Sequence, residues 1–489
     1  MSLKGLIQRN KTLARLVLYS SPLVLLGGAA GIIFLLSVVD PRKDWKDVDF
    51  LEFESVRLLQ EYLRIDTSYP DGSEIAGAEY LASLFEKEGI DVYVERLGTR
   101  NANLWAELPG KNRQALVLHN HIDVIPALRA DEWRYDPFGG EIDLPFIYGR
   151  GAFDMKSVAI AQAMAIFDLA RSGTPLNRSV LFLATGEEER DSYLGTQRVL
   201  RQHPELRKRM WGMLTEGGAV EAVSVDEARY WGTSFNQRHF VDIWVCDSDL
   251  GRMEDLRSLL DKRQTDRRMT PALAAFFERY GPTRDRPETR SVMAVPTDML
   301  ERLRTFPRDI DVTVVPPNVE AMLRSRVVAF PIQKDPEGGY LMRVILHLQS
   351  DLGYEDIWDE LIGDALDGFT YRIEDISEPN MGSPLDHEIF TRIDAFMEKQ
   401  YPTIVHGPLS IPFSASDARF FRSYGIPSYG FTPFHILSSD TGGMKGVNER
   451  MALPAFVVGV ELYSGLVREL VAGPSNLGTG ADDRRREAL

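Results

Sequence analysis

Cysteine is nearly absent from this sequence: Cys246 is the only one among 489 residues. One cysteine excludes an internal disulfide and any zinc site built from several thiolates, so a bound metal would need His, Asp and Glu ligands. Positive charge is also scarce, since 56 Lys and Arg face 72 Asp and Glu, a net charge of -16. Proteins that bind nucleic acids usually carry a basic stripe, so we expect no nucleic-acid partner.

The chain is too long for one compact core, so we expect two domains. Its 44% hydrophobic and 26% charged residues are an ordinary globular balance. The last segment, residues 472–489, is polar and contains glycine, which predicts a disordered tail.

One long apolar run lies near the N-terminus. Basic residues within 1–15 precede an uncharged segment of 24 residues over 16–39, and a charged linker follows over 40–50. As a helix this segment is long enough to cross a bilayer. A cleaved signal peptide is the rival interpretation, but its apolar part would be shorter and would end at a small-residue cleavage site. We therefore expect a single-pass membrane anchor with the N-terminus in the cytoplasm and the bulk of the chain in a periplasmic or other extracytoplasmic space.

Beyond the linker, helical and strand patterns alternate along the chain. Short apolar runs bounded by turn residues are separated by helical stretches such as residues 158–171. This alternation predicts an α/β sheet with helices on both faces. A different order of strands and helices in the middle of the chain indicates a small inserted α+β unit. The predicted boundaries are 51–223 for the first part of the larger domain, 224–374 for the insertion and 375–471 for the second part.

Acidic and imidazole side chains follow three of the predicted strands. In open α/β sheets ligands bind at the carboxyl ends of strands, so we expect these side chains to meet in one crevice. A further carboxylate lies in the glycine-containing turn GRGAFDMKS. The full set is His121, Asp123, Asp154, Glu188, Glu189 and Glu216.

This set suits the chemistry of a zinc hydrolase. Imidazole nitrogen and carboxylate oxygen are zinc ligands, and a carboxylate beside the metal can deprotonate the attacking water. Each element alone also has a structural explanation: an HxD pair is more often part of the core, and a run of glutamates is usually a solvated helix start. Their shared position at strand ends favours a metal site for the set as a whole.

Six segments resemble, in order and spacing, the signature blocks of the two-zinc aminoacylase, peptidase and carboxypeptidase family. They are HNHIDVIPA, GRGAFDMKS, LFLATGEEERDSYLGT, TEGGAV, SASDARFF and GVNERM. The resemblance spans residues 51–471, with the insertion where that family has its lid, or dimerisation, domain. It implies a catalytic domain with a mostly parallel sheet, a ferredoxin-like α+β lid, a peptide or N-acyl amino acid substrate and one or two zinc ions. It also allows a homodimer formed through the lid.

The resemblance further assigns roles to single residues, for some of which a structural salt bridge is an equal alternative. These roles are general base for Glu188; carboxylate orienting a ligand for Asp123; ligands of the first zinc for His121 and Glu216; bridging ligand for Asp154; ligand of the second zinc for Glu189; and substrate contacts for Arg326, Asp417 and Arg419.

Three positions depart from the family pattern. Lys445 stands where the second zinc should have a histidine, and a protonated ammonium has no lone pair for a metal. We expect it to form a salt bridge in place of the second cation, with His435 as a weaker alternative ligand. The lid lacks the family's histidine block, so that Arg252 is the nearest cationic side chain, and Thr313 replaces an asparagine.

Two functions fit these observations. One is a membrane-anchored, metal-dependent hydrolase of amide bonds with a single zinc held by His121, Asp154 and Glu216. The other is a catalytically silent relative that acts as a binding or assembly module at the membrane. The retained ligand set favours the hydrolase, because clustered buried carboxylates without a cation would repel one another.

Overall fold

The computed structural model describes residues 48–472 except for 225–226, 286–289, 291–292, 294, 306–320, 337, 377–378, 380–381, 412–414 and 438–442. Within this part of the chain no helix is both long and apolar enough to cross a membrane. The longest one there, α19 (Leu453–Ala472), packs along α6 (Lys156–Ser172) as part of the core. This finding corrects the prediction of a single-pass membrane protein with an extracytoplasmic chain, since the described residues contain no membrane-spanning helix. The span predicted over 16–39 and the predicted tail after Ala472 lie outside the described residues.

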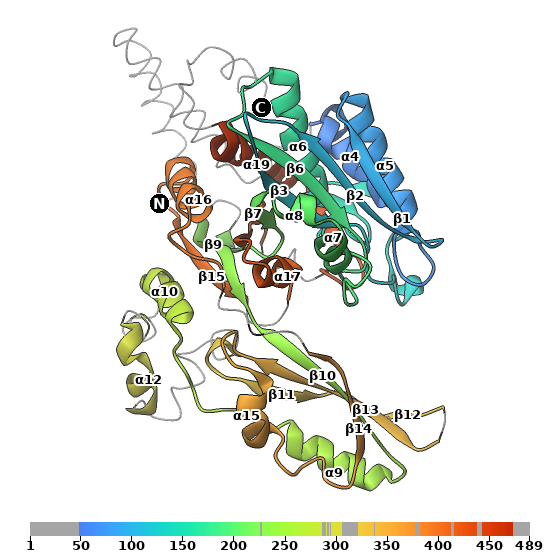
Figure 1. Ribbon diagram of the computed structural model, residues 1–489, viewed down its shortest axis with the longest axis vertical. Helices are drawn as coiled ribbons and strands as arrows, with labels where there is room; N and C mark the ends of the chain where they lie inside the picture. Colours follow the sequence, from blue (N-terminus) through green and yellow to red (C-terminus); the bar gives the residue numbers. More distant parts are fainter. Residues whose placement is uncertain are drawn as a thin grey trace, which may run out of the picture.

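The larger domain is built on a mixed sheet in the order β1-β2-β6-β3-β7-β16-β9-β15, with β8 paired to β9 (Figure 1). β3 pairs in parallel with β6 and β7, but β1–β2, β2–β6, β8–β9 and β16–β9 are antiparallel. The predicted mostly parallel sheet is thus corrected to a mixed one: β1–β2 and β8–β9 are hairpins, and β2 and β16 run opposite to their non-consecutive partners β6 and β9. The strands are β1 (Val92–Leu97), β2 (Asn101–Leu108), β3 (Asn112–His121), β6 (Arg178–Thr185), β7 (Met210–Thr215), β8 (Ala219–Ser224), β9 (Glu227–Gln237), β15 (Val405–Ile411) and β16 (Ser428–Gly430).

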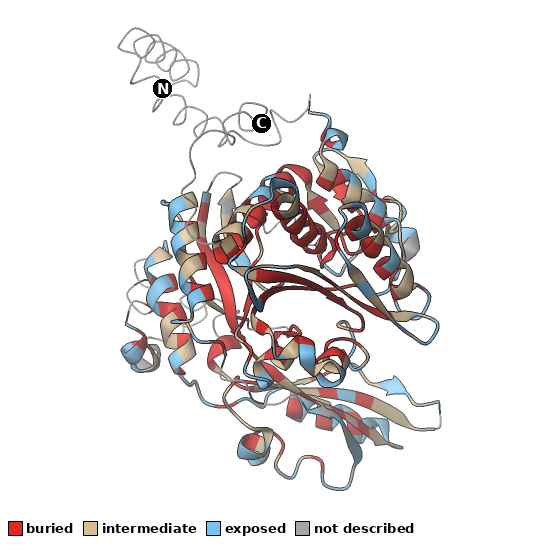
Figure 2. Cartoon of the chain, turned by 45° about the horizontal axis from the view of Figure 1, so that its top comes forward, coloured by how far each residue is buried: buried red, intermediate tan, exposed pale blue. Residues whose placement is uncertain are grey.

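Helices cover both faces of this sheet, as the alternating pattern predicted (Figures 1 and 2). Leu116 and Leu118 of β3 pack in one apolar cluster and Val117 in another, because successive strand side chains point to opposite faces. The first cluster includes α4 (Glu54–Leu63), α5 (Glu74–Lys87), α6, α16 (Glu388–Gln400) and α19; the second includes α7 (Thr196–Gln202), α8 (Pro204–Arg207) and α17 (Ala418–Ser423).

A second sheet, in the order β11-β13-β10-β14 with β12 paired to β13, forms the lid at one end of the molecule (Figure 1). Neighbouring strands are antiparallel and, apart from the two-residue strand β12, the lid elements follow the order β-α-β-β-α-β, which is a ferredoxin-like arrangement. Its apolar face packs against two helices. The elements are β10 (His239–Asp247), α9 (Leu250–Leu260), β11 (Arg326–Ala329), β12 (Gln333–Lys334), β13 (Tyr340–Leu348), α15 (Tyr354–Leu361) and β14 (Thr370–Ile376).

The insertion predicted over 224–374 is not a single unit. β9 lies in the main sheet, so the lid sheet begins at His239. The chain between α9 and β11 returns to the larger domain, where Phe276 and Phe277 of α10 (Pro271–Tyr280) pack with Tyr230 of β9. The remaining described elements are α12 (Pro296–Thr305), the short helices η2 (Phe50–Glu52), η3 (Ala130–Glu132) and η4 (Gly281–Thr283), and a small sheet of β4 (Glu141–Asp143), β5 (Phe146–Tyr148) and β17 (Arg450–Ala452).

Candidate metal centre

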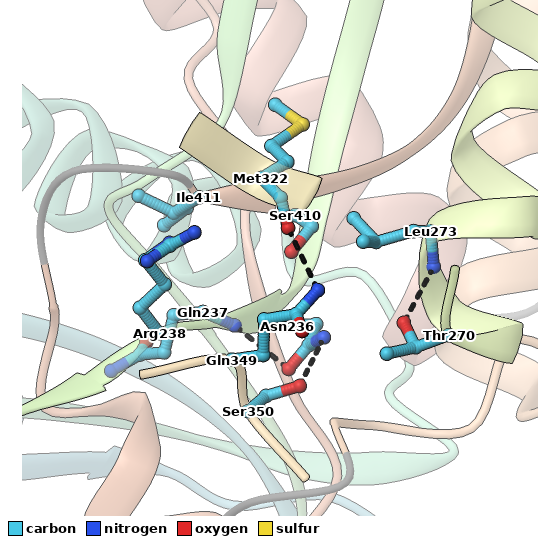
Figure 3. A pocket seen from close by; sticks show the side chains of 10 residues that line it. All are labelled: Asn236, Gln237, Arg238, Thr270, Leu273, Met322, Gln349, Ser350, Ser410 and Ile411. Carbon is cyan, nitrogen blue, oxygen red and sulfur yellow. Dashed lines mark hydrogen bonds between the residues drawn. The ribbon is translucent and has the colours of Figure 1, made fainter. Parts of the chain in front are cut away.

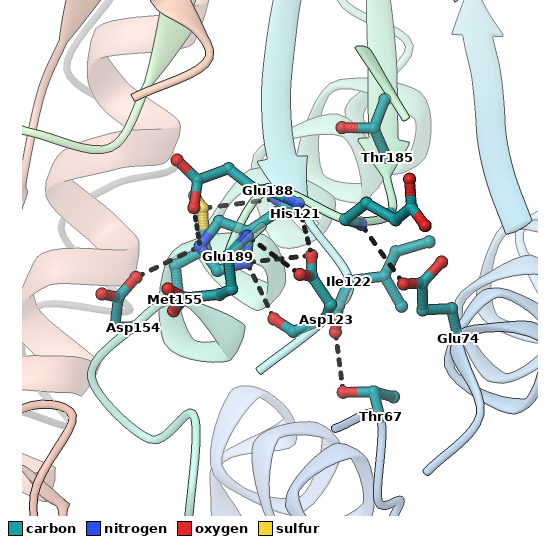
Figure 4. A network of polar contacts seen from close by, with 12 residues as sticks. Thr67, Glu74, His121, Ile122, Asp123, Asp154, Met155, Thr185, Glu188 and Glu189 are labelled. Atoms are coloured by element: carbon teal, nitrogen blue, oxygen red, sulfur yellow. Dashed lines mark hydrogen bonds and ion pairs between the residues drawn. The ribbon is translucent and has the colours of Figure 1, made fainter. Parts of the chain in front are cut away.

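The sheet order brings the predicted ligands to one place. β3 lies between β6 and β7 and runs parallel to both, so the carboxyl ends of these strands meet at one edge. His121 is the last residue of β3, Glu188 and Glu189 follow β6, and Glu216 follows β7. Asp154 reaches the same point from the loop before α6 (Figure 4).

The ring nitrogen Nε2 of His121 faces the carboxylates. It lies 3.2 Å from Asp154 Oδ1, 3.9 Å from Glu188 Oε2 and 4.0 Å from Glu216 Oε2. One candidate ligand atom from each of His121, Asp154 and Glu216 lies within 4.8 Å of the others. Zinc binds nitrogen and oxygen at about 2.0–2.2 Å in a tetrahedral arrangement, which separates its ligand atoms by roughly 3–4 Å. The donor types and their spacing therefore fit one zinc ion.

Asp123 contacts both His121 and the loop that carries Glu188 and Glu189. The Nδ1 atom of His121 lies 2.8 Å from the backbone carbonyl oxygen of Asp123, closer than the 3.7 Å to its carboxylate. That carboxylate instead accepts hydrogen bonds from the backbone N–H groups of Glu188 and Glu189, each at 3.0 Å. Burial raises the pKa of Asp123 to about 6. Its backbone thus orients the imidazole, and its side chain fixes the loop that carries the two glutamates.

Burial and crowding shift the titration of the cluster. Burial raises the pKa of Glu188 to about 8, and burial with the charge of Asp154 raises the pKa of Glu216 well above its usual range. Burial alone would raise the pKa of Asp154, but the hydrogen bond with His121 and the charge of Lys445 hold it far below that range. Carboxylates that oppose one another's ionisation in this way are a favourable site for a cation.

Lys445 occupies the position between two of the carboxylates. Its Nζ atom lies 2.5 Å from Glu189 Oε2 and 3.3 Å from Asp154 Oδ2, which is the expected salt bridge. Burial would lower the pKa of Lys445, but the charges of Asp154 and Glu189 raise it above its usual value, so it is an ammonium at neutral pH. The side chain of Lys445 is 41% exposed, so the pair is open to solvent on one side.

His435 is not part of the grouped ligands among the described residues. Its Nε2 lies 3.0 Å from the carbonyl oxygen of Ser224, and its ring packs edge-on to Trp231. The structure therefore does not bring the alternative ligand to the carboxylate cluster.

Of the two predicted residues of the SASDARFF block, Asp417 contacts the chain segment that follows Glu188 and Glu189. Asp417 is buried, accepts a hydrogen bond from the Ser192 hydroxyl and lies 3.7 Å from His119 Nε2. The Arg419 guanidinium lies 4.5 Å from the centre of the Phe420 ring. Through its hydrogen bond with Ser192, Asp417 thus supports the loop that carries Glu188 and Glu189.

For the lid residues singled out from the sequence, the contacts described below are with other residues of the lid. Arg252 pairs with Asp247 at 2.9 Å and donates to the carbonyl oxygen of Gly368 at 3.0 Å. Arg326 lies opposite His347 in the β11–β13 pair. Burial, together with the charges of Arg238 and Arg326, lowers the pKa of His347 to about 4. Thr313 lies outside the described residues.

A separate small pocket lies where the lid joins the larger domain (Figure 3). Asn236 at the end of β9 donates to the Ser350 hydroxyl at 2.9 Å, and Arg238 donates to the His347 carbonyl oxygen at 2.9 Å. These bonds join the two domains. No residue that lines this pocket belongs to the carboxylate cluster, so we place the chemistry at the cluster.

Two buried carboxylates near the site were not assigned from the sequence. Glu74 at the start of α5 accepts from the backbone N–H groups of Ala102 and Glu187, each at 3.2 Å, and so supports the glutamate loop. Glu449 holds the loop of Asp154 in the same way. The block GVNERM contains Glu449 but gave it no role, and Glu74 lies in the first turn of α5, where acidic residues are common for reasons unrelated to a site.

An imidazole and carboxylate cluster at the strand ends of a mixed sheet, with a ferredoxin-like insertion, defines a two-domain metallohydrolase. The chain matches Peptidase family M20/M25/M40 over residues 117–469, and it belongs to that family. The predicted family resemblance and the predicted enzyme class, a metallopeptidase or related amidohydrolase, are confirmed. Members of this family are typically dinuclear metal-binding peptidases.

The relatives are distant. Aminoacylase-1B of Rattus norvegicus is 24% identical over 440 residues, which cover 87% of this chain and 97% of that enzyme. Succinyl-diaminopimelate desuccinylase of Methylocella silvestris is 34% identical over 155 residues, 31% of this chain and only 39% of that enzyme. The structure of the M20 family metallo-carboxypeptidase Sso-CP2 from Sulfolobus solfataricus shares the fold, with a TM-score of 0.64, 16% identity, and coverage of 86% of this chain and 99% of that one.

Proposed function

We propose that the chain hydrolyses an amide bond in a small peptide or an N-acyl amino acid, with one zinc ion per chain. The observation that carries this proposal is the position of Lys445, whose ammonium contacts Asp154 and Glu189. The family resemblance gives these two carboxylates to the second zinc. A cation fixed to the chain would compete with an ion for that position.

The ligands proposed for the single zinc are His121, Asp154 and Glu216. Three protein ligands with an open fourth position are the usual pattern of a catalytic zinc. When bound there, the ion would polarise a carbonyl oxygen and lower the pKa of a water molecule.

The chain's own residues supply the proton transfer and the charge. Glu188 lies 3.9 Å from His121 Nε2, next to the proposed zinc ligands. As a carboxylate it would take a proton from the attacking water and return it to the leaving amine. Lys445 would supply part of the positive charge that a second ion brings, and its charge adds to the hydrogen bond of His121 in holding the pKa of Asp154 low.

The names of the relatives, an aminoacylase, a desuccinylase and a carboxypeptidase, support the proposed substrate class. We propose that Arg326, Asp417 and Arg419 contribute to substrate binding, and that the lid forms a homodimer interface. The oligomeric state in solution tests the second point.

The first experiment is the metal content of the full chain, purified without chelator and measured by elemental mass spectrometry. Hydrolysis of a panel of N-acyl amino acids and dipeptides is measured on the same protein. Glu188→Gln should lower kcat by roughly 10²–10⁴-fold without unfolding the chain, because it removes the proton acceptor. The matched control is Glu79→Gln, a carboxylate that is 51% exposed and paired with Arg96, which should leave kcat unchanged.

About one zinc per chain with Glu188-dependent hydrolysis would support the proposal. Two ions per chain would show that Lys445 does not displace the second metal. No metal uptake from added zinc, together with no hydrolysis, would indicate a catalytically silent binding module instead.

A further inference from the structure

Glu449 is a buried carboxylate whose hydrogen bonds converge on one loop. It is 1% exposed, and its Oε1 accepts from the backbone N–H groups of Gly151, Phe153 and Asp154 at 3.1, 3.0 and 3.2 Å. Its Oε2 accepts from Arg150 Nη1 at 2.5 Å. The loop so held is the one that carries Asp154.

The backbone of Glu449 is joined to the same segment. The N–H of Gly149 donates to the Glu449 carbonyl oxygen at 3.0 Å, and the next residue, Arg450, pairs with Tyr148 between β17 and β5. Lys445 lies only four positions before Glu449 in the sequence. The loop that carries the ammonium and the loop that carries Asp154 are therefore joined through Glu449.

The loop has little freedom to find another arrangement. Gly151 has a φ of +87°, which side-chain-bearing residues rarely adopt, and a Cβ there would lie 2.8 Å from Val124. Without the Glu449 carboxylate, three N–H groups at this packed position would lose their acceptor, and unsatisfied buried donors are costly.

We propose that Glu449 is a positioning residue that holds the backbone around Asp154 so that this carboxylate faces both His121 and Lys445. This inference rests on the proposed function, in which Asp154 is a zinc ligand. Glu449 acts through the loop backbone, and the residues that would contact zinc and substrate are others. Partners that orient metal ligands typically change metal affinity by about 10–100-fold when they are removed.

The test is the dissociation constant for zinc, measured by competition with a chromogenic chelator on the full chain. Glu449→Ala removes the acceptor and should weaken zinc binding by roughly 10–100-fold. Glu449→Gln retains one carbonyl oxygen for the N–H groups and should lose less. The matched control is Glu54→Gln, which breaks a half-exposed carboxylate–arginine contact with Arg171 at the far end of α6 and should leave zinc affinity unchanged.

Two further measurements separate positioning from general destabilisation. Arg150→Met combined with Glu449→Gln removes the buried charge pair but keeps the acceptor, so its zinc affinity should match that of Glu449→Gln alone or exceed it. Hydrogen exchange of the amides of residues 151–154, measured on the metal-free chain, should accelerate in Glu449→Ala and much less in Glu449→Gln.

A folded Glu449→Ala variant with wild-type zinc affinity and unchanged exchange in residues 151–154 would overturn the inference. If Glu449→Ala does not fold, the Gln and double variants decide: an Arg150→Met, Glu449→Gln chain that binds zinc more weakly than Glu449→Gln would show that Arg150, and not the acceptor at Glu449, positions the loop. If the wild-type chain takes up no zinc, the proposed function fails, while amide exchange still decides whether Glu449 positions the loop.

Discussion

Replacing Lys445 by methionine removes the ammonium while keeping a side chain of similar length. At an effective dielectric constant of about 20, two unit charges 3.3 Å apart, the separation of Lys445 Nζ and Asp154 Oδ2, interact by about 5 kcal/mol. That figure is an upper limit, because the lysine side chain is 41% exposed and solvent screens the pair. Breaking a buried pair costs about 3–5 kcal/mol and an exposed pair about 0.2–1 kcal/mol. We expect Lys445→Met to lower the free energy of unfolding by roughly 1–3 kcal/mol, between those limits.

The assay is urea unfolding of the metal-free chain, repeated with added zinc. Because zinc binds the folded state, an ion at 100 times its Kd adds about 2.7 kcal/mol. Lys445→Met should gain more from zinc than the wild type does, since Asp154 and Glu189 become free for an ion. The control is Arg96→Met, which breaks an exposed pair with Glu79 and should cost less than about 1 kcal/mol at any zinc concentration.

One result would refute the reasoning. If Lys445→Met were as stable as the wild type without metal and gained no more from zinc, the ammonium would be a solvated surface charge and not the counterpart of a second ion. The single-zinc proposal would then lose its main support.

Two other variants test neighbouring parts of the structure. Lys445→His restores an imidazole at the altered position, so metal analysis should rise from one zinc per chain towards two; a constant value of one would show that the loop cannot present the new ligand. Glu74→Gln should change the pH dependence of stability. Burial raises the pKa of Glu74 to about 8 from 4.5, so between these values the folded chain binds more protons than the unfolded chain, and the free energy of unfolding falls as pH rises. The glutamine variant should lack this decline, which urea unfolding at pH 5.5 and pH 8 would detect; equal slopes in both proteins would contradict it.

The convergence of the ligands could be predicted because it depends on strand order and on little else. His121, Glu189 and Glu216 each follow an apolar run, and the carboxyl ends of neighbouring parallel strands coincide. The salt bridge of Lys445 followed in the same way, because an ammonium placed among carboxylates has few other partners. The ferredoxin-like lid was predicted from the family resemblance. The β-α-β-β-α-β order of the lid elements in the structure agrees with that prediction.

Contacts made through the backbone could not be predicted. The Asp123 carboxylate binds the N–H groups of Glu188 and Glu189, and Glu449 binds those of the Asp154 loop. Nearly every residue has a backbone N–H group, so the pattern of side chains in the sequence does not predict which carboxylate will accept its hydrogen bond. The mixed sheet was missed for a related reason, since hairpins at the edges depend on turn geometry and not on the apolar runs themselves.

Formal charge explains how a lysine can stand at a metal position and why metal content is the decisive measurement. Asp154, Glu188, Glu189 and Glu216 bring one negative charge each, which two zinc ions would balance. One zinc and the ammonium of Lys445 leave a single negative charge, which agrees with a cluster in which Glu188 is ionised and can accept a proton. Removing the ammonium leaves two negative charges. A Lys445→Met chain must then take up a proton or a second cation, and only its metal stoichiometry distinguishes the two.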